Sequence, residues 1–425
     1  MDQLMAGRVL MGDSLGFHII FALLGVGLPV VVAILEFMAL RRGDSELRKS
    51  AKFWSYVSGI LVITGVLSGT VVALQMFLVW PGILQFGGKA IALAFAWEGY
   101  AFILEAIFLG FYLKTWDKLK GWAHWALLWP VIIGASLSGF LITSVDAWMN
   151  HPSGIAVANG QVISADPVGA IFTQTTYLQA SHSILSYYLT AILLAAAVFA
   201  WRLLRGTATG KAAAAARLAA GRLGVIALVL LGGIVVLGDL SAKYLATNEP
   251  VKLAAIEQLA TSAAHAPFRF GEWEVPGLLS WLVGGSTGTF VRGLDAVPSD
   301  QLPPLYIHTL FDIKLILIVL LSCAVVGFAG LYLAKSHRAF TKPWLWLVVA
   351  APLVSVSVIE LGWMVTEIGR QPYAVMGYVT TSEAITTSPG VLALGWLFPA
   401  AYVVLAAVTT YAIRRLVAAQ KGGAK

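Results

Sequence analysis

The chain has 425 residues, of which 59% are hydrophobic and only 12% are charged, a balance that excludes a soluble globular domain. A soluble fold of this size could not bury so much apolar surface. The net charge of +7 does not indicate a nucleic-acid partner, because the basic residues occupy short segments between apolar runs instead of one soluble face. We therefore expect an integral membrane protein that binds no nucleic acid.

Nine long apolar runs predict an all-α integral membrane protein that forms a single domain over residues 1–425. A spanning helix needs about 20 mostly apolar residues, because lipid offers no hydrogen-bond partner to the backbone. The predicted spans, in chain order, are 14–40, 53–80, 90–113, 124–148, 178–201, 223–245, 306–334, 343–368 and 390–413. We expect the Ala-rich stretch 211–220 to form a short separate helix in a loop. No repeat of fixed period is found, which argues against an inverted-repeat transporter.

The distribution of basic residues predicts how the chain crosses the membrane. Alternate loops and the C-terminal tail hold 20 of the 28 Lys and Arg residues. The positive-inside rule therefore places the N-terminus outside and the C-terminus in the cytoplasm. The first apolar run lacks a basic n-region and is too long for the apolar part of a signal peptide, so we expect it to be retained.

Two long connections are predicted on the outer side, at 150–175 and at about 246–303. Loops of such length in compact proteins are usually functional or disordered. We expect both of them to cap a site near the outer face.

Ionisable residues within the spans are the candidates for chemistry, because each costs several kcal/mol in a membrane unless it is paired, protonated or bound to a cofactor. They are His18, Glu36, Glu98, Glu105, Asp146, His182, Asp312, Lys314, Glu360 and Glu367. The single cysteine, Cys323, excludes an intrachain disulfide, a Cys-based iron–sulfur site and a CxxCH haem attachment. Any haem must therefore be held by His, Met, Lys or a carboxylate.

The two histidines of this set, His18 and His182, lie at similar depths near the outer ends of their spans. An imidazole there can ligate iron through one ring nitrogen. Taken singly, either residue is more simply read as a hydrogen-bonded histidine at the membrane interface. Two of them at one depth favour a cofactor cluster.

Four glutamates form two stripes with a spacing of seven residues, Glu98 with Glu105 and Glu360 with Glu367. Because seven residues are nearly two helical turns, both carboxylates of a stripe project from one helix face. The first stripe can relay protons, and Glu360 can ligate or neutralise a metal centre. The alternative is that each glutamate only hydrogen-bonds a neighbouring helix.

Two basic residues complete the candidate site. Lys314 and Asp312 are two residues apart and so point to different sides of a helix, which leaves the lysine to pair with a carboxylate of another span or to contact a ligand. Arg370, at an outer helix end, can clamp a haem propionate or a quinone oxygen, although a lone arginine there is also a common interfacial anchor.

A series of motifs occurs in a fixed order along the chain. They are His18 after Arg8; GVLSG (65–69) with Gln75 and Trp80; EGYAFILEAIFLG (98–110) and WDKL (116–119); WMNHP (148–152); His182; GDLS (238–241); KLAAIE (252–257) with APF (266–268); and ELGW (360–363) with GRQP (369–372). In this order and on nine spans, they make the chain resemble a divergent subunit I of the cytochrome bd-type quinol oxidases over nearly its whole length.

The resemblance implies a haem-containing subunit of a terminal oxidase in a bacterial or archaeal cytoplasmic membrane, which oxidises quinol, reduces dioxygen to water and generates a proton gradient. The implied cofactors are haem b and either haem d or a second high-spin haem b. The implied partners are a second integral membrane subunit that completes a heterodimer, small accessory subunits in some assemblies, and the quinone pool.

The resemblance also assigns haem ligands. By it, His18 is an axial ligand in the high-spin haem pair, Glu360 is the carboxylate ligand of the partner haem, and His182 ligates the low-spin haem b. Trp363 and Arg370 lie in matching motifs and are assigned to cofactor binding.

Roles in proton and quinol chemistry follow from the same resemblance. Glu98 and Glu105 serve the oxygen site and its proton path. Lys252 and Glu257 match the family's quinol-binding pair in the loop at about 246–303.

One departure from the family pattern keeps other hypotheses open. Lys314 stands where the family has the Met ligand of the low-spin haem, and neutral lysine can ligate iron whereas a protonated lysine cannot. A second hypothesis is therefore a bd-like oxidoreductase subunit that takes electrons from a non-quinol donor or lacks the standard low-spin haem. A third is a haem-free transporter or structural subunit whose buried charges pair with one another.

Overall fold

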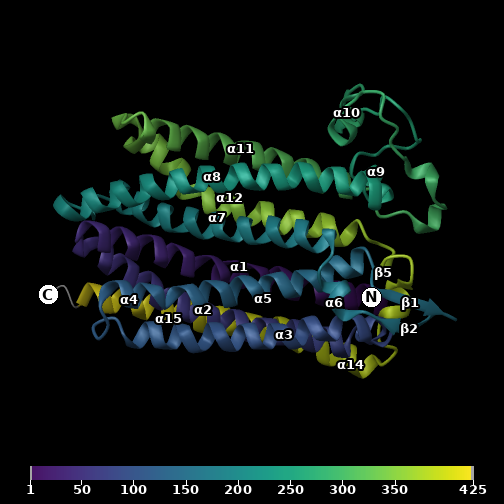
Figure 1. Cartoon of the computed structure of the whole chain (residues 1–425), viewed down its shortest axis with the longest axis horizontal. Helices are drawn as coiled ribbons and strands as arrows, with labels where there is room; N and C mark the ends of the chain where they lie inside the picture. The colour runs from purple at the N-terminus through teal and green to yellow at the C-terminus, as the bar shows by residue number, and fades with distance from the viewer. Residues whose placement is uncertain (1, 423–425) are drawn as a thin grey trace.

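The structure, a computed structural model, describes residues 2–422 (Figure 1). Within this range, nine helices are long and apolar enough to cross a membrane. Their bounds are α1 (Gln3–Arg42), α2 (Ser45–Leu78), α3 (Pro81–Lys114), α4 (Gly121–Ala126) continued by α5 (Leu128–Asn150), α7 (Gln174–Leu204), α8 (Gly210–Asn248), α11 (Ile307–Leu333), α12 (Lys342–Ile368) and α14 (Pro389–Gly395) continued by α15 (Leu397–Gly422). The predicted all-α membrane fold is thereby confirmed.

Each of the nine predicted spans lies on one of these helices, but five helices, α1, α2, α3, α8 and α15, extend 8–13 residues beyond the predicted limit at one end. The Ala-rich stretch 211–220 was predicted wrongly as a separate helix, because it forms the first turns of α8. A run of strong helix formers directly before an apolar span has nothing to interrupt it. Of the predicted domain 1–425, residues 1 and 423–425 lie outside the described range.

Helix starts and ends follow the local sequence. The Asp2 carboxylate accepts hydrogen bonds from the first backbone amides of α1, and the Asp44 carboxylate does the same for α2. Between them, Gly43 ends α1 with a φ of 62°, a left-handed conformation that glycine adopts without strain. A turn of two residues, Gly43 and Asp44, therefore suffices to join two antiparallel helices.

Small residues allow the helices to approach closely. A Cβ added at Gly27 of α1 would lie 2.6 Å from both the Ala191 Cβ and the Tyr187 carbonyl oxygen of α7. Close backbone approach of this kind is the usual basis of helix association in lipid, where apolar burial supplies little driving force. In Figure 1 the helices lie side by side along the long axis, with the two termini at opposite ends of the bundle.

One end of the bundle carries nearly all of the non-membrane structure (Figure 1). Between α5 and α7 lie a hairpin of β1 (Ile155–Ala158) and β2 (Gln161–Ala165) and the short α6 (Pro167–Ile171). After α12 come β5 (Tyr373–Val375), β6 (Val379–Thr380) and α13 (Thr381–Ala384). The N-terminus lies at this same end, and the opposite end has short connections and η3 (His337–Phe340).

The longest connection, between α8 and α11, folds into a small lobe. It contains α9 (Pro250–Ile256), β3 (Phe268–Phe270), β4 (Trp273–Val275), α10 (Leu278–Gly284), η1 (Leu294–Ala296) and η2 (Ser299–Gln301). The lobe has an apolar core of its own, formed by Leu253, Ala254, Leu259, Ala266, Leu279 and Val291. It is therefore an ordered structure over the end of the bundle.

Candidate functional site

His18 of α1 is held in one orientation by α2. Its Nδ1 lies 2.9 Å from the Ser68 Oγ, and that hydroxyl donates to the Gly65 carbonyl oxygen at 3.0 Å. Because the hydroxyl hydrogen is used on the carbonyl, His18 Nδ1 is the donor to Ser68. The ring therefore presents Nε2 as its free lone pair, the arrangement that a metal-ligating histidine needs.

Two glycines lie close to His18 and to Glu360, one beside each. A Cβ added at Gly69 would lie 3.0 Å from His18 Cε1, and one added at Gly16 would lie 3.7 Å from Glu360 Oε2. Glu360 of α12 thus reaches α1 two residues away from His18, and its Oε1 is buried without a hydrogen-bond partner. Leaving a buried oxygen without a hydrogen-bond partner costs about 1–3 kcal/mol. An unpaired oxygen here is therefore the kind of group that a bound ligand can satisfy.

A second histidine lies on the side of α7 that faces α8. His182 of α7 has a buried Nδ1 without a hydrogen-bond partner, and a Cβ at Gly238 of α8 would lie 3.8 Å from its Cε1. Lys314 of α11 points toward α12, where its Nζ is 3.8 Å from the Cβ position of Gly362.

No carboxylate within residues 2–422 lies close enough to Lys314 to form an ion pair, so the first of the two alternatives, pairing with another span, is not found in this structure. The ammonium instead lies over the Phe311 ring, 5.3 Å from its centroid. Asp312 pairs elsewhere, as expected for two residues on different sides of a helix.

The first glutamate stripe faces a single neighbour, as its spacing predicted. Glu105 is buried at 4% exposure, and the Cβ position of Gly134 on α5 is 2.9 Å from its backbone nitrogen. Glu98, two turns away, lies beside the Ser138 hydroxyl, one turn further along α5. Both carboxylates therefore line the interface of α3 with α5.

Lys252 joins the lobe to the end of the bundle. It lies on α9 at 4% exposure, forms an ion pair with Glu249, and donates from Nζ to the Asn150 Oδ1 at 2.6 Å. The Asn150 Nδ2 donates in turn to the Asp146 backbone oxygen at 3.0 Å and to its Oδ1 at 3.3 Å. A buried polar chain therefore runs from α9 into α5.

Arg370 extends this chain to α12. Its guanidinium forms an ion pair with Glu367, three residues earlier, and its Nη1 lies 3.5 Å from the Asp146 Oδ1. The Nε of Arg370 is buried without a partner. Arg370 is thus engaged with two carboxylates and keeps one free donor, while Trp363 lies half-buried further along α12.

Glu257, at the end of α9, lies beneath β3. Its Oε2 accepts a hydrogen bond from the Arg269 backbone nitrogen at 3.2 Å. Burial raises the pKa of this carboxyl to about 7, the Arg269 amide opposes the shift, and the negative charge of Asp312 adds to it. A carboxyl with a pKa near 7 can accept and release protons at physiological pH.

Next to Glu257 lies a pair from one face of α11. His308 Nδ1 bonds the Ile256 carbonyl oxygen at 2.7 Å, and its Nε2 lies 3.3 Å from Asp312 Oδ2. That same Oδ2 accepts from the Gly271 backbone nitrogen at 2.8 Å. Asp312 Oδ1 is buried without a partner. The lobe and α11 are therefore joined by a polar cluster with an open acceptor.

Another buried polar cluster lies at the opposite end of the bundle, and the sequence predicted only part of it. Glu36 of α1 accepts from the Tyr112 hydroxyl at 2.6 Å and lies 2.6 Å from His124 Nδ1. His124 Nε2 faces the Tyr112 carbonyl oxygen at 3.0 Å and must carry a hydrogen, since a carbonyl only accepts. One proton is therefore shared between His124 and Glu36.

Of that cluster, the sequence had singled out only Glu36. His124 could have been found from its position, because it begins a predicted span and closely follows the WDKL motif.

Comparison with known proteins gives this geometry a context. The family model described as cytochrome bd terminal oxidase subunit I matches residues 6–421. The chain belongs to that family. The predicted resemblance is confirmed, and the family's bacterial members place this chain among multi-pass membrane oxidoreductases.

Of two relatives, one matches almost end to end and the other over part of its length. The putative cytochrome bd menaquinol oxidase subunit I of Bacillus subtilis (strain 168) is 33% identical, covering 97% of this chain and 96% of the relative. The cytochrome bd-II ubiquinol oxidase subunit 1 of Escherichia coli (strain K12) is 28% identical over 68% of this chain and 59% of its own length.

A solved structure of a cytochrome bd oxidase shows the same fold. The bd oxidase from Geobacillus thermodenitrificans superposes with a TM-score of 0.90 at 34% identity, covering 98% of each chain. The bundle and the terminal lobe described here are therefore those of a cytochrome bd subunit I.

Proposed function

We propose that this chain is the haem-bearing subunit of a terminal oxidase that oxidises quinol, reduces dioxygen to water and thereby generates a proton gradient. Two observations carry the proposal. The His18 imidazole is fixed by Ser68 so that its Nε2 lone pair is free, and Glu360, which has an unpaired carboxylate oxygen, reaches the same helix at Gly16.

The residues fit a high-spin haem pair. His18 would hold one iron through Nε2, and a carboxylate of α12 would hold the other. Glu360 suits this role better than Glu367, because Glu367 is engaged by Arg370. Gly16 and Gly69 leave the space that larger residues would fill. Such haems, when bound, supply the iron at which electrons reduce dioxygen.

His182 fits a low-spin haem b. Its unpartnered Nδ1 and the small Gly238 opposite leave an imidazole with space to one side. Lys314 is a candidate for the second ligand position, since no carboxylate of the described chain neutralises it and only Phe311 lies over it. Arg370 Nε, which has no partner, is a donor that can hold a propionate or a quinone oxygen.

The lobe is the proposed quinol site. Glu257, with a pKa raised to about 7, can take a proton from a quinol hydroxyl, and Lys252 holds α9 against the bundle through Asn150. Glu98 and Glu105 would deliver protons to the oxygen site along α3. Protons released at the lobe and protons consumed from the other side together separate charge across the membrane.

The cofactors we propose are haem b and either haem d or a second high-spin haem b, with menaquinol or another quinol as donor, since the relatives are named as menaquinol and ubiquinol oxidases. The name of the family, subunit I, supports a heterodimer with a second integral membrane subunit in a cytoplasmic membrane.

Haem content tests the proposal. We expect the purified wild-type complex to give a pyridine haemochrome signal and to lose part of it in His18→Ala and in His182→Ala. The matched control is His337→Ala, which removes an exposed histidine of the opposite end. A wild-type complex without haem would refute the redox assignment.

The α12 ligand is tested in the same assay. Loss of the high-spin signal in Glu360→Gln and its retention in Glu367→Gln would support Glu360. The reverse result would move the ligand two turns toward the lobe.

A second candidate function is a bd-like subunit that receives electrons from a non-quinol donor, favoured by Lys314 alone. Lys314→Met distinguishes the two. A low-spin spectrum in the wild type that shifts in Lys314→Met would support ligation by lysine, whereas a low-spin spectrum that appears only in Lys314→Met would favour the second candidate.

A further inference from the structure

Four aromatic side chains form one continuous surface at the end of the bundle opposite the lobe, where α4 lies in Figure 1. Phe37 of α1 packs against Trp122 and Trp125 of α4, with ring centroids 5.8 and 6.0 Å apart. Trp125 in turn packs against Trp122 at 5.9 Å and against Trp129 of α5 at 5.5 Å. We call these four residues the aromatic platform.

The aromatic platform is fixed on one side and open on the other. The Trp125 Nε1 donates to the Ala33 carbonyl oxygen of α1 at 2.9 Å, which holds the central ring against the bundle. Phe37, Trp122 and Trp129 are 43%, 49% and 49% exposed. Indole rings favour the membrane interface, because they combine an apolar body with a polar N–H group. The open side is therefore suited to contact with lipid.

Two exposed cations flank the platform. Arg41 follows Phe37 by four residues and so lies on the same face of α1. Lys120 directly precedes α4. The two segments are in close contact, since a Cβ added at Gly121 would meet the side chain of Leu40. Both positive charges therefore belong to the same edge of the platform.

These two cations are free to bind an anion. Neither forms an ion pair within the described residues 2–422, and the carboxylates of the adjoining turns are already engaged. Glu46 pairs with Lys49, and Asp117 pairs with Arg48 and Lys52. Two unpaired positive charges beside an apolar surface are complementary to a negative headgroup joined to acyl chains.

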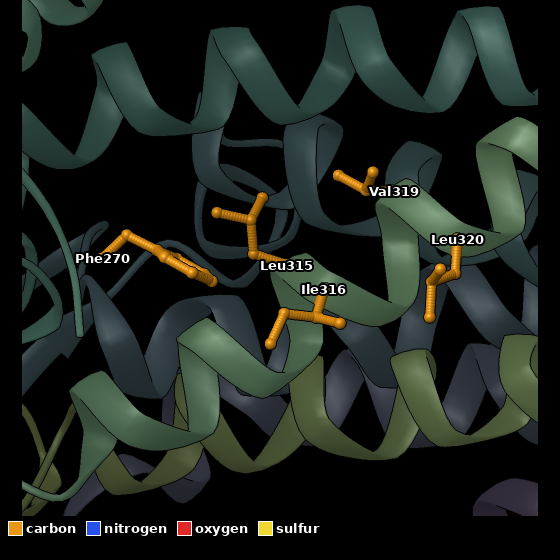
Figure 2. Close-up of a pocket in the computed structure, with 5 residues that line it drawn as sticks. All are labelled: Phe270, Leu315, Ile316, Val319 and Leu320. Carbon is orange, nitrogen blue, oxygen red and sulfur yellow. The ribbon is translucent and has the colours of Figure 1, made fainter. Parts of the chain in front are cut away.

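Another apolar surface of the molecule lacks this charge pattern. The groove between β3 and α11 is lined by Phe270, Leu315, Ile316, Val319 and Leu320 (Figure 2). All five are apolar, so these side chains cannot distinguish one lipid headgroup from another. The groove therefore serves as an internal reference for lipid contact without charge recognition.

We propose that the aromatic platform is a binding site for an anionic phospholipid of the membrane. The acyl chains lie along Trp125 and Trp129, and the phosphate lies by Arg41 and Lys120, beyond the Trp122 ring. A zwitterionic phospholipid carries a cation of its own, which these two charges repel. The inference is independent of the proposed redox function, because none of these residues is a proposed haem ligand or quinol contact.

Photolabelling of the intact purified complex tests the site. The probes are phosphatidylglycerol and phosphatidylcholine with the same diazirine-bearing acyl chain, each reconstituted in nanodiscs and mapped by peptide mass spectrometry. We expect residues 122–129 to be labelled more strongly by phosphatidylglycerol than by phosphatidylcholine. Residues 315–320, which form most of the reference groove, should be labelled equally by the two lipids.

Charge variants show whether the preference comes from the two cations. We expect Arg41→Gln and Lys120→Gln each to lower the labelling ratio of phosphatidylglycerol to phosphatidylcholine at residues 122–129 by about fivefold. That factor corresponds to the roughly 1 kcal/mol that one cation contributes near a membrane surface. The matched control is Lys49→Gln, which removes the same charge at the same end but from a lysine paired with Glu46 at 2.7 Å.

Three results would overturn the proposal. Equal labelling of residues 122–129 by both lipids would reduce the platform to ordinary aromatic anchors of the interface. Absence of labelling by either lipid would mean that another protein chain covers the platform in the complex. An effect of Arg41→Gln and Lys120→Gln no larger than that of Lys49→Gln would show that net charge, and not this site, sets the preference.

Discussion

The shared proton between Glu36 and His124 predicts a strongly coupled pair. Their side chains are 3% and 2% exposed, and the atoms that face each other are 2.6 Å apart. His124→Phe keeps an aromatic ring against Tyr112, now stacked with centroids 4.2 Å apart, but leaves the Glu36 carboxyl without its partner. Removing one member of a buried ion pair costs about 3–5 kcal/mol.

The double variant Glu36→Leu with His124→Phe should recover part of that loss. It removes both ionisable groups and leaves only the Tyr112 hydroxyl without a partner, at a cost of about 1–3 kcal/mol. The assay is thermal unfolding of the purified complex in one detergent, followed for both single variants, the double variant and the wild type. If the two single losses simply add in the double variant, the residues do not share a proton, and the reasoning is wrong.

Three further predictions concern the other clusters. Ser68→Val should release the His18 ring and broaden or shift the high-spin optical spectrum at nearly unchanged expression; an identical spectrum would contradict the orienting role. For Glu257, kcat/KM for quinol should rise as the pH passes upward through about 7, because the carboxylate form accepts the proton, and Glu257→Gln should flatten that limb of the profile. Asn150→Leu should destabilise the complex by about 2 kcal/mol, because the buried Lys252 ammonium loses an acceptor; an unchanged thermal midpoint would argue against this contact.

Long apolar runs made the helices predictable, because each span must satisfy its own backbone. Spacing also predicted that Glu98 and Glu105 would face one neighbour. The pairing of residues distant in sequence could not be predicted in this way. Glu36 and His124 are 88 residues apart, and no local pattern indicates which buried groups meet across three helices.

The surroundings of Lys314 could not be predicted from the sequence either. Electrostatics alone favours a counter-ion for a buried lysine, so a carboxylate partner was the natural expectation. In the structure its ammonium lies over the Phe311 ring and near Gly362 of α12. Its role depends on what occupies the neighbouring space, which composition and periodicity do not report.

The lobe between α8 and α11 is joined to the bundle by polar contacts and by the apolar cluster of Ala255, Ile256, Ile307 and Val365. Among its ties are Lys252 to Asn150, His308 to the Ile256 carbonyl, and Asp312 to the Gly271 amide. A segment with a core of its own can open as one cooperative unit at a lower free energy than the bundle. A molecule held beneath the lobe can then exchange only when these contacts break together. The rate of that local opening therefore limits the rate of exchange.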